Sequence, residues 1–169
     1  IAMNNLANLY QHQRKWAEAE PLLVKALEGY RRVFGEEHPD TLTVKGNLVS
    51  GYCSQHESAE AEPLSVQVLE VSTRVFGEEA PRTLTAMESM AQVYQEQFKY
   101  TQAEVLMLKT LEVSRRVRGE EHPCTLRVMN NLGGLYRDQD KFDQAEPWYV
   151  RTLDTQRRVL GEEHPNTLI

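Results

Sequence analysis

The chain has 169 residues, 40% of them hydrophobic and 26% charged, and its formal net charge is −6. This acidic balance argues against a nucleic-acid partner, which would need a basic surface, and against binding to anionic membranes. No apolar run approaches the roughly 18 residues that are needed to cross a bilayer. Cys53 and Cys124 belong to no CxxC motif and are typical of free thiols in a reducing compartment, so we expect a cytoplasmic protein.

Four glycines that precede a pair of glutamates recur every 42 positions, at Gly35, Gly77, Gly119 and Gly161. Residues 119–160 repeat residues 35–76 at nearly half of their positions without a gap. A period of this length is typical of a stacked repeat array. We predict a single array over residues 1–169, with units at about 1–39, 40–81, 82–123 and 124–165 and a stub of a fifth unit at 166–169.

Each period contains two helical patterns, which lie in the second period at about 40–55 and 60–76. Apolar residues recur three and four positions apart, as on the buried face of a helix, and no alternation of period two is long enough to predict a strand. One column is alanine in every period: Ala19, Ala61, Ala103 and Ala145. We therefore predict an all-α fold of four antiparallel helix pairs.

The recurring connector, whose first copy reads GEEHPDTL, separates one helix pair from the next. Gly35 is suited to a left-handed cap after the longer helix, and Pro39 cannot continue a helix and favours a new start. Asp40 or Thr41 is the expected N-cap of the following helix. The repeated string is thus interpreted as punctuation between helical hairpins.

A metal site is the alternative interpretation of the GEEHP string. His38, His122 and His164 would have to converge, although the repeat places them in different units and the third connector has Ala80 instead. The HESAE segment at His56 lacks the second histidine of a zinc protease motif. We therefore expect no metal site and no cofactor.

The sequence contains no set of residues that is typical of an enzyme. Cys53 and His56 lie three positions apart, but no third group that would orient the histidine is evident in the sequence. The glycines lie in connectors and in the shorter helices, and not in a loop that would hold phosphate. We expect no catalytic residue and no enzyme activity.

Leu6, Ala7, Tyr10 and Ala19 form a pattern that resembles the tetratricopeptide repeat. That family has a Leu–Gly/Ala pair and a tyrosine on the first helix of each pair, and an early alanine on the second. The 42-residue period and the GEEHP connector resemble the variant found in kinesin light chains. The resemblance implies a right-handed superhelical solenoid with the first helices on its concave wall, and a protein interaction module within a larger adaptor or signalling protein.

Positions on the first helices that are not used for packing form the predicted peptide-binding surface. One column reads Asn5, Asn47, Ser89, Asn131, and a carboxamide can both donate to and accept from a peptide backbone. The resemblance implies the same use, because kinesin light chains have such an asparagine. The alternative is a solvated helix face without a ligand. The predicted site residues are Asn4, Asn5, Asn8, Gln11, Asn47, Ser50, Ser89, Gln92, Arg127, Asn130, Asn131 and Arg137.

The second period departs from the pattern. Gly46 and Gly51 lie inside its first helix, and each glycine costs about 1 kcal/mol relative to alanine. Ser58 stands where the other periods have an aromatic residue: Trp16, Tyr100 and Phe142. We predict that this unit is the least stable.

A structural spacer or a self-associating array is the alternative to a peptide-binding module. The chain starts inside a first helix and stops at GEEHPNTLI, so that neither end has a polar capping helix. Uncapped repeats expose apolar surface. We therefore expect head-to-tail packing between copies.

Overall fold

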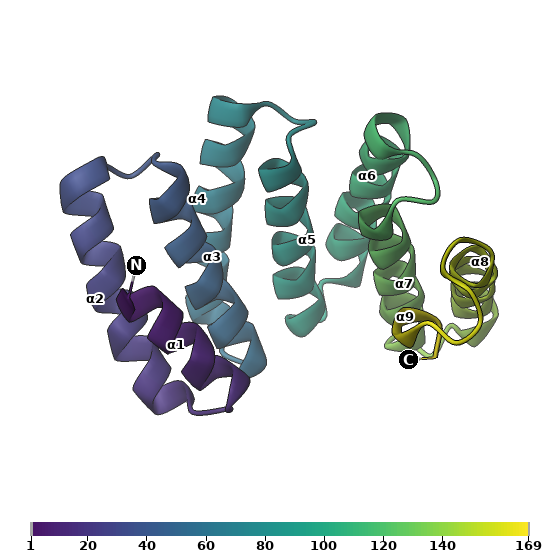
Figure 1. The fold of residues 1–169 in the computed structure, drawn as a ribbon, viewed down its shortest axis with the longest axis horizontal. Helices are drawn as coiled ribbons and strands as arrows, with labels where there is room; N and C mark the ends of the chain where they lie inside the picture. Colours follow the sequence, from purple (N-terminus) through teal and green to yellow (C-terminus); the bar gives the residue numbers. More distant parts are fainter. Residues whose placement is uncertain (1, 169) are drawn as a thin grey trace. The chain divides into compact units, whose positions relative to one another are not determined.

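The computed structural model describes residues 2–168, and within that range every regular element is an α-helix (Figure 1). The predicted all-α class is confirmed. Shorter and longer helices alternate, and the shorter helices after the first begin at prolines 42 positions apart. The helices are α1 (Ala2–His12), α2 (Trp16–Phe34), α3 (Pro39–Ser54), α4 (Ser58–Phe76), α5 (Pro81–Glu96), α6 (Tyr100–Arg118), α7 (Pro123–Arg137), α8 (Phe142–Leu160) and the short α9 (Pro165–Leu168).

The chain divides into two compact units, of which the first ends at Phe98 and the second begins at Lys99. In the first unit, consecutive helices from α1 through α5 pack against one another, and α3 also contacts α1 and α5 (Figure 1). In the second unit, α7 packs against α6 and α8, and α9 packs against α8. The extension of one repeat array over the whole chain stays a prediction.

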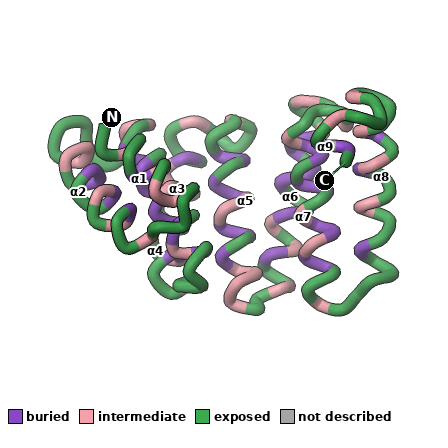
Figure 2. Tube along the Cα trace, turned by 60° about the horizontal axis from the view of Figure 1, so that its bottom comes forward, coloured by how far each residue is buried: buried purple, intermediate pink, exposed green. Residues whose placement is uncertain are grey.

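Buried residues follow the helix faces that meet their neighbours, whereas the connectors are mostly exposed (Figure 2). The alanine column is buried near the start of each longer helix, where a methyl group lets a neighbouring helix approach closely. Its four members, at most 3% exposed, are Ala19, Ala61, Ala103 and Ala145. The Leu/Met column of the shorter helices is equally buried at Leu48, Met90 and Leu132, but Leu6 is 40% exposed.

Histidine side chains cap two of the shorter helices. His38 is the N-cap of α3, and its Nδ1 accepts a hydrogen bond from the backbone N–H of Asp40 at 3.2 Å. His122 caps α7 in the same way through the N–H of Cys124 at 3.1 Å. The expected cap at Asp40 or Thr41 is wrong, because the helix already begins at the proline that follows the histidine.

The regular spacing of glycine and threonine in the connector has a direct structural reason. Gly35 has a φ of +89°, a conformation that favours glycine over residues with a side chain. Its carbonyl accepts a hydrogen bond from Thr41 Oγ1 at 2.8 Å. Thr125 closes the connector before α7 through the carbonyl of Gly119 at the same distance. The threonines therefore hold the connectors closed and are not N-caps.

A buried lysine lies in the core of the first unit. Lys45 is 2% exposed and occupies the column that is methionine in the other three periods. Its Nζ contacts Glu36 Oε2 at 2.6 Å and Gln67 Oε1 at 3.1 Å, and Arg31 contacts the other oxygen of Glu36 at 2.8 Å. The lysine hydrogen bond to Glu36 is the largest of the interactions that lower the pKa of that carboxyl group.

Candidate functional site

Three of the predicted site residues meet between α1 and α3. The side-chain Nδ2 of Asn47 donates to Oδ1 of Asn4 at 2.8 Å, and Gln11 Nε2 donates to the backbone carbonyl of Asn47 at 2.9 Å. Asn47 Oδ1 accepts no hydrogen bond from residues 2–168, so the amide presents an acceptor. Asn4 therefore fixes the orientation of the Asn47 amide.

Two further amides lie on α1. Asn5 is exposed. Asn8 is half-buried, and its Oδ1 is buried without a hydrogen-bond partner among the described residues. A buried carbonyl oxygen without a donor is costly, because it has lost its hydrogen bonds to water. This oxygen is therefore an acceptor without a donor on α1, in addition to Asn47 Oδ1 on α3.

A hollow of about 570 Å³ lies between α3 and α5. It brings together three predicted residues, Asn47, Ser50 and Ser89. Gln92 is exposed on the next turn of α5 and does not line the hollow. Gly46 also lines the hollow. It occupies the repeat position that is Asn4 in α1, so α3 has no side chain at the position from which Asn4 reaches the next shorter helix.

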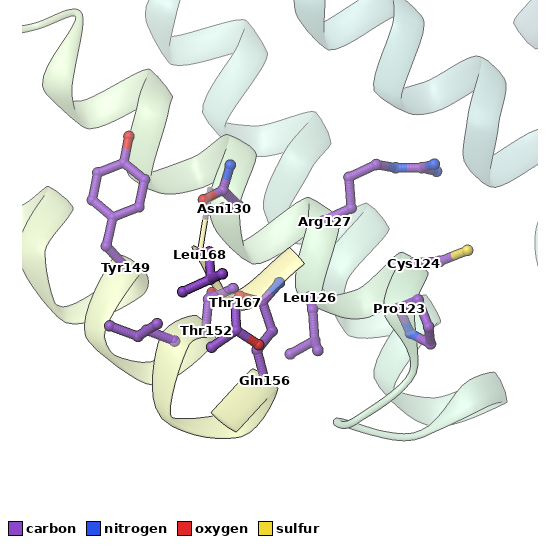
Figure 3. A pocket seen from close by; sticks show the side chains of 11 residues that line it. Pro123, Cys124, Leu126, Arg127, Asn130, Tyr149, Thr152, Gln156, Thr167 and Leu168 are labelled. Carbon is purple, nitrogen blue, oxygen red and sulfur yellow. The ribbon is translucent and has the colours of Figure 1, made fainter. Parts of the chain in front are cut away.

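The second unit has a hollow of about 670 Å³ between α7, α8 and α9 (Figure 3). Arg127 and Asn130 line it, and Figure 3 shows Asn130 between Tyr149 and Arg127. Asn131 is half-buried and has no hydrogen bond to the described residues. Arg137 does not line the hollow, and its guanidinium pairs with Asp138 at 2.9 Å.

The two hollows are made from the same repeat columns. Five lining positions of the α7 hollow follow those of the α3 hollow by two periods. The pairs are Leu42 and Leu126, Thr43 and Arg127, Gly46 and Asn130, Val68 and Thr152, and Ser72 and Gln156. The repeat therefore builds a side-chain hollow beside the second turn of a shorter helix in each unit.

Arg82 is a lining residue that the sequence did not single out. Its Nη1 donates to the carbonyl of Pro39 and to Thr43 Oγ1, both at 3.1 Å, and so joins α5 to the start of α3. Its column contains aspartate in the first connector and cysteine in the third, at Asp40 and Cys124. No pattern in the sequence distinguished this position from the exposed connector.

Tyrosine and glutamate join neighbouring helix pairs in both units. Tyr52 donates to Glu20 Oε1 at 2.8 Å, and Tyr136 donates to Glu104 Oε1 at 2.6 Å. Burial, followed by the hydrogen bond to the carboxylate, raises the pKa of each tyrosine to about 12. Tyr52 and Tyr136 are thus links between repeats and are not part of the ligand surface.

Cys53 and His56 do not form a nucleophile–base pair. Burial, with a smaller contribution from the Glu96 carboxylate, raises the pKa of the Cys53 thiol to about 11, so the thiol is protonated at neutral pH. His56 Nδ1 instead lies 2.8 Å from Glu96 Oε2. Neither cysteine is in a disulfide.

The described residues contain no group of three or more histidine, cysteine, aspartate or glutamate side chains placed to hold a metal ion. Nor does any helix within residues 2–168 have the length and apolarity that would let it cross a membrane.

Comparisons with known proteins identify the repeat. Family models described as tetratricopeptide repeat match residues 1–40, 40–107 and 87–155. The comparison with curated proteins gives no match.

Solved structures of kinesin-light-chain-like repeats are similar to this chain. A Podosopora anserina protein of that kind, with nearly identical TPR-like repeats, has a TM-score of 0.82 and 24% identity over 99% of this chain and 79% of its own. A single-residue variant of that protein has a TM-score of 0.83 and 23% identity over the same shares. BtubC (BKLC) from P. vanneervenii has a TM-score of 0.80 and 23% identity over 97% of this chain and 65% of its own. At these identities the likeness shows the fold alone, an all-α repeat of the kinesin-light-chain-like type.

Proposed function

Because the chain belongs to the tetratricopeptide repeat family, whose members generally serve protein interaction, we propose that it binds an extended peptide segment of a partner protein along its shorter helices. The ligand-facing residues are the amides and hydroxyls of α1, α3 and α5 in the first unit and of α7 in the second. The protein acts in the cytoplasm, as part of a larger adaptor or signalling protein, and catalyses no reaction.

The orientation of the Asn47 amide is the observation that carries this proposal. Asn47 Nδ2 is already hydrogen-bonded to Asn4, and Asn47 Oδ1 is available to accept a hydrogen bond from a peptide backbone N–H. The Asn131 amide, which has no partner among residues 2–168, can both donate and accept. Such contacts are independent of the ligand's side chains.

The lining of the hollows supports the same use. Each hollow lies beside the shorter helix of one unit and within the range of about 300–1,000 Å³ that is typical of ligand pockets. Each is lined by a mixture of apolar groups and a few polar ones and includes a single arginine, Arg82 or Arg127, with no carboxylate. The hollows therefore offer no negative charge to a peptide that carries several positive charges.

Selection from a displayed library of random peptides, followed by calorimetry, tests the proposal. Asn47→Ala should weaken a peptide that binds the first unit, and Asn131→Ala one that binds the second, each by about 0.5–1.5 kcal/mol, the net value of one hydrogen bond. Gln144→Ala, which removes an exposed amide from α8, is the matched control and should leave the affinity unchanged. Failure to select any peptide, or equal affinities for all four proteins, would contradict the proposal.

A second candidate function is self-association into head-to-tail copies, which one observation favours. Leu6 is 40% exposed, whereas its equivalents Leu48, Met90 and Leu132 are buried. Leu153 of α8 is half-buried, as its equivalent Leu69 is, and shows no such contrast. A second copy that covered Leu6 would repeat the contact that joins consecutive repeats within a unit.

Sedimentation equilibrium distinguishes this candidate. Self-association predicts a mass that rises with concentration and returns to that of one chain in Leu6→Gln. A single-chain mass across the accessible concentrations would exclude it.

A further inference from the structure

Gly46 leaves open space on the α3 side of the hollow between α3 and α5, because it has no side chain. A Cβ built on Gly46 meets no atom within 4 Å, and the glycine lines the hollow. In the preceding helix pair, Asn4 stands in the same register position and extends to Asn47. We infer that the Gly46 hollow is the subsite for one uncharged, apolar side chain of the bound peptide, and that Gly46 sets the size of that side chain. This inference rests on the proposed function.

The floor of the hollow is apolar. Leu42, Val68 and Ala86 line it from α3, α4 and α5, and their exposed fractions are 4%, 9% and 3%. These side chains already belong to the packed core, so they form a fixed surface and not a mobile one. Because they are almost fully buried already, the apolar area that binding removes from water is mainly that of the ligand side chain, at about 25 cal/mol per Å².

Two of the hydroxyl groups around this floor are already engaged. Thr43 Oγ1 donates to the carbonyl of Pro39 at 2.9 Å, and Thr85 Oγ1 donates to that of Pro81 at 3.0 Å. Satisfied hydroxyl groups do not require a polar ligand, because burying them again costs little.

The one charged lining residue is held in place as part of the wall. Arg82 donates to the carbonyl of Pro39 and to Thr43 Oγ1, and its guanidinium lies 5.9 Å from the centre of the Phe76 ring. No carboxylate lines the hollow to receive a cationic side chain. An apolar side chain therefore matches the lining better than a charged one.

The hollow lies next to the proposed backbone contact. Asn47 lines the hollow and also presents the Oδ1 acceptor. An extended peptide turns successive side chains to opposite faces, so one side chain beside the bound N–H faces the helices and the next faces solvent. The hollow therefore selects one side chain of the peptide, while Asn47 binds its backbone.

Gly46→Leu tests the inference without the usual risk to folding. The Cβ has open space, and leucine has a higher helix propensity than glycine, so the melting temperature should rise or stay the same. Gly29→Leu is the matched control, because Gly29 is also a helical glycine with no atom within 4 Å of its Cβ, but it does not line this hollow.

The probes are N-acetyl-phenylalaninamide and N-acetyl-glycinamide, titrated into the ¹⁵N-labelled chain and followed by backbone amide chemical shifts. The phenylalanine derivative should shift the amides of residues 42–50 and 81–89, and the glycine derivative, which lacks the side chain, should not. Gly46→Leu should weaken the phenylalanine probe by roughly tenfold or more, as expected when the burial of an apolar side chain is lost. Gly29→Leu should bind as the unaltered chain does.

The absence of these shifts, or equal binding by Gly46→Leu and Gly29→Leu, would overturn the inference. Its failure can be distinguished from failure of the proposed function. If selected peptides bind and depend on Asn47 and Asn131 but not on position 46, only the subsite is wrong. If the phenylalanine probe occupies the hollow but no peptide is ever selected, the proposed function is wrong and the apolar hollow remains.

Discussion

The α-carbon of Gly51 lies directly against the indole ring of Trp16. A Cβ built on Gly51 would lie 2.0 Å from Cζ3 and 2.2 Å from Cη2 of that ring, far inside van der Waals contact. The indole also packs edge-on against Tyr52, with ring centres 5.3 Å apart, which restricts its movement. Gly51 is therefore a packing requirement between the first two helix pairs.

Gly51→Ala should destabilise the protein although alanine is the better helix former. The gain in helix propensity is at most about 1 kcal/mol, whereas overpacking typically costs about 1–3 kcal/mol. The free energy of unfolding from urea titration gives the sign. Gly46→Ala is the control and should stabilise, since its Cβ meets nothing. Equal stabilisation by both alanines would contradict the packing described for Trp16.

Lys45→Met should leave the stability unchanged or raise it. Methionine occupies this column in the other periods. It would replace a buried ammonium group whose partner, the Glu36 side chain, is 56% exposed, and removing a charge from the core is often neutral or stabilising. Glu36 would keep its contact to Arg31 at 2.8 Å. A change in the other member of the pair, Glu36→Gln, should destabilise the protein, because it leaves the buried lysine without its counter-charge. Urea titration of both variants should therefore give opposite signs, and a loss of stability in Lys45→Met would refute this account of the lysine.

The same pair predicts a pH dependence. Since Lys45 lowers the pKa of the Glu36 carboxyl group in the folded state, the stabilisation is present above the unfolded pKa of glutamate, about 4.3, and is lost as the pH falls through the folded pKa. Lys45→Met should reduce the loss of stability on acidification. Melting temperatures of the two proteins between neutral and acidic pH measure this, and parallel curves would show that the pair contributes nothing.

The tyrosine links predict a loss of stability in alkali. The folded pKa of Tyr52 is raised to about 12, above the ordinary value of about 10. The raised pKa of this acid contributes stability that is full below pH 10 and is lost as the pH rises through 12. Tyr52→Phe should therefore show a smaller alkaline loss, as measured by chemical denaturation at several pH values. An unchanged alkaline profile would mean that neither the burial of the Tyr52 hydroxyl nor its hydrogen bond to Glu20 raises its pKa.

The repetition of 42 residues was sufficient to predict the helices and their boundaries within one or two residues, because periodic apolar columns report burial directly. Helix α4 begins at Ser58 where about residue 60 was predicted. The sequence also identified Asn47 and Asn131 as candidate peptide-binding residues. The lower stability predicted for the second unit stays a prediction.

Contacts between the side chains of different helices could not be predicted from single repeat columns. The hydrogen bond between Asn4 and Asn47 joins positions in adjacent columns of different periods, and it makes Asn4 a positioning residue for the Asn47 amide. Gly133 likewise leaves room for Tyr149, because a Cβ built on Gly133 would lie 2.9 Å from the Tyr149 ring. Side-chain sizes and hydrogen-bond partners are matched across the helix interface. The residues of a single repeat column do not show this matching.

Binding of backbone-methylated peptides tests the central claim most directly. Each N–H of a selected peptide is methylated in turn, and the affinities for the unaltered chain and for Asn47→Ala are compared as a double-mutant cycle. If the Asn47 carboxamide accepts a backbone N–H, one methylation weakens binding to the unaltered chain and has little further effect on Asn47→Ala. If every methylation has the same effect on both proteins, the amide does not bind the peptide backbone and the account is contradicted.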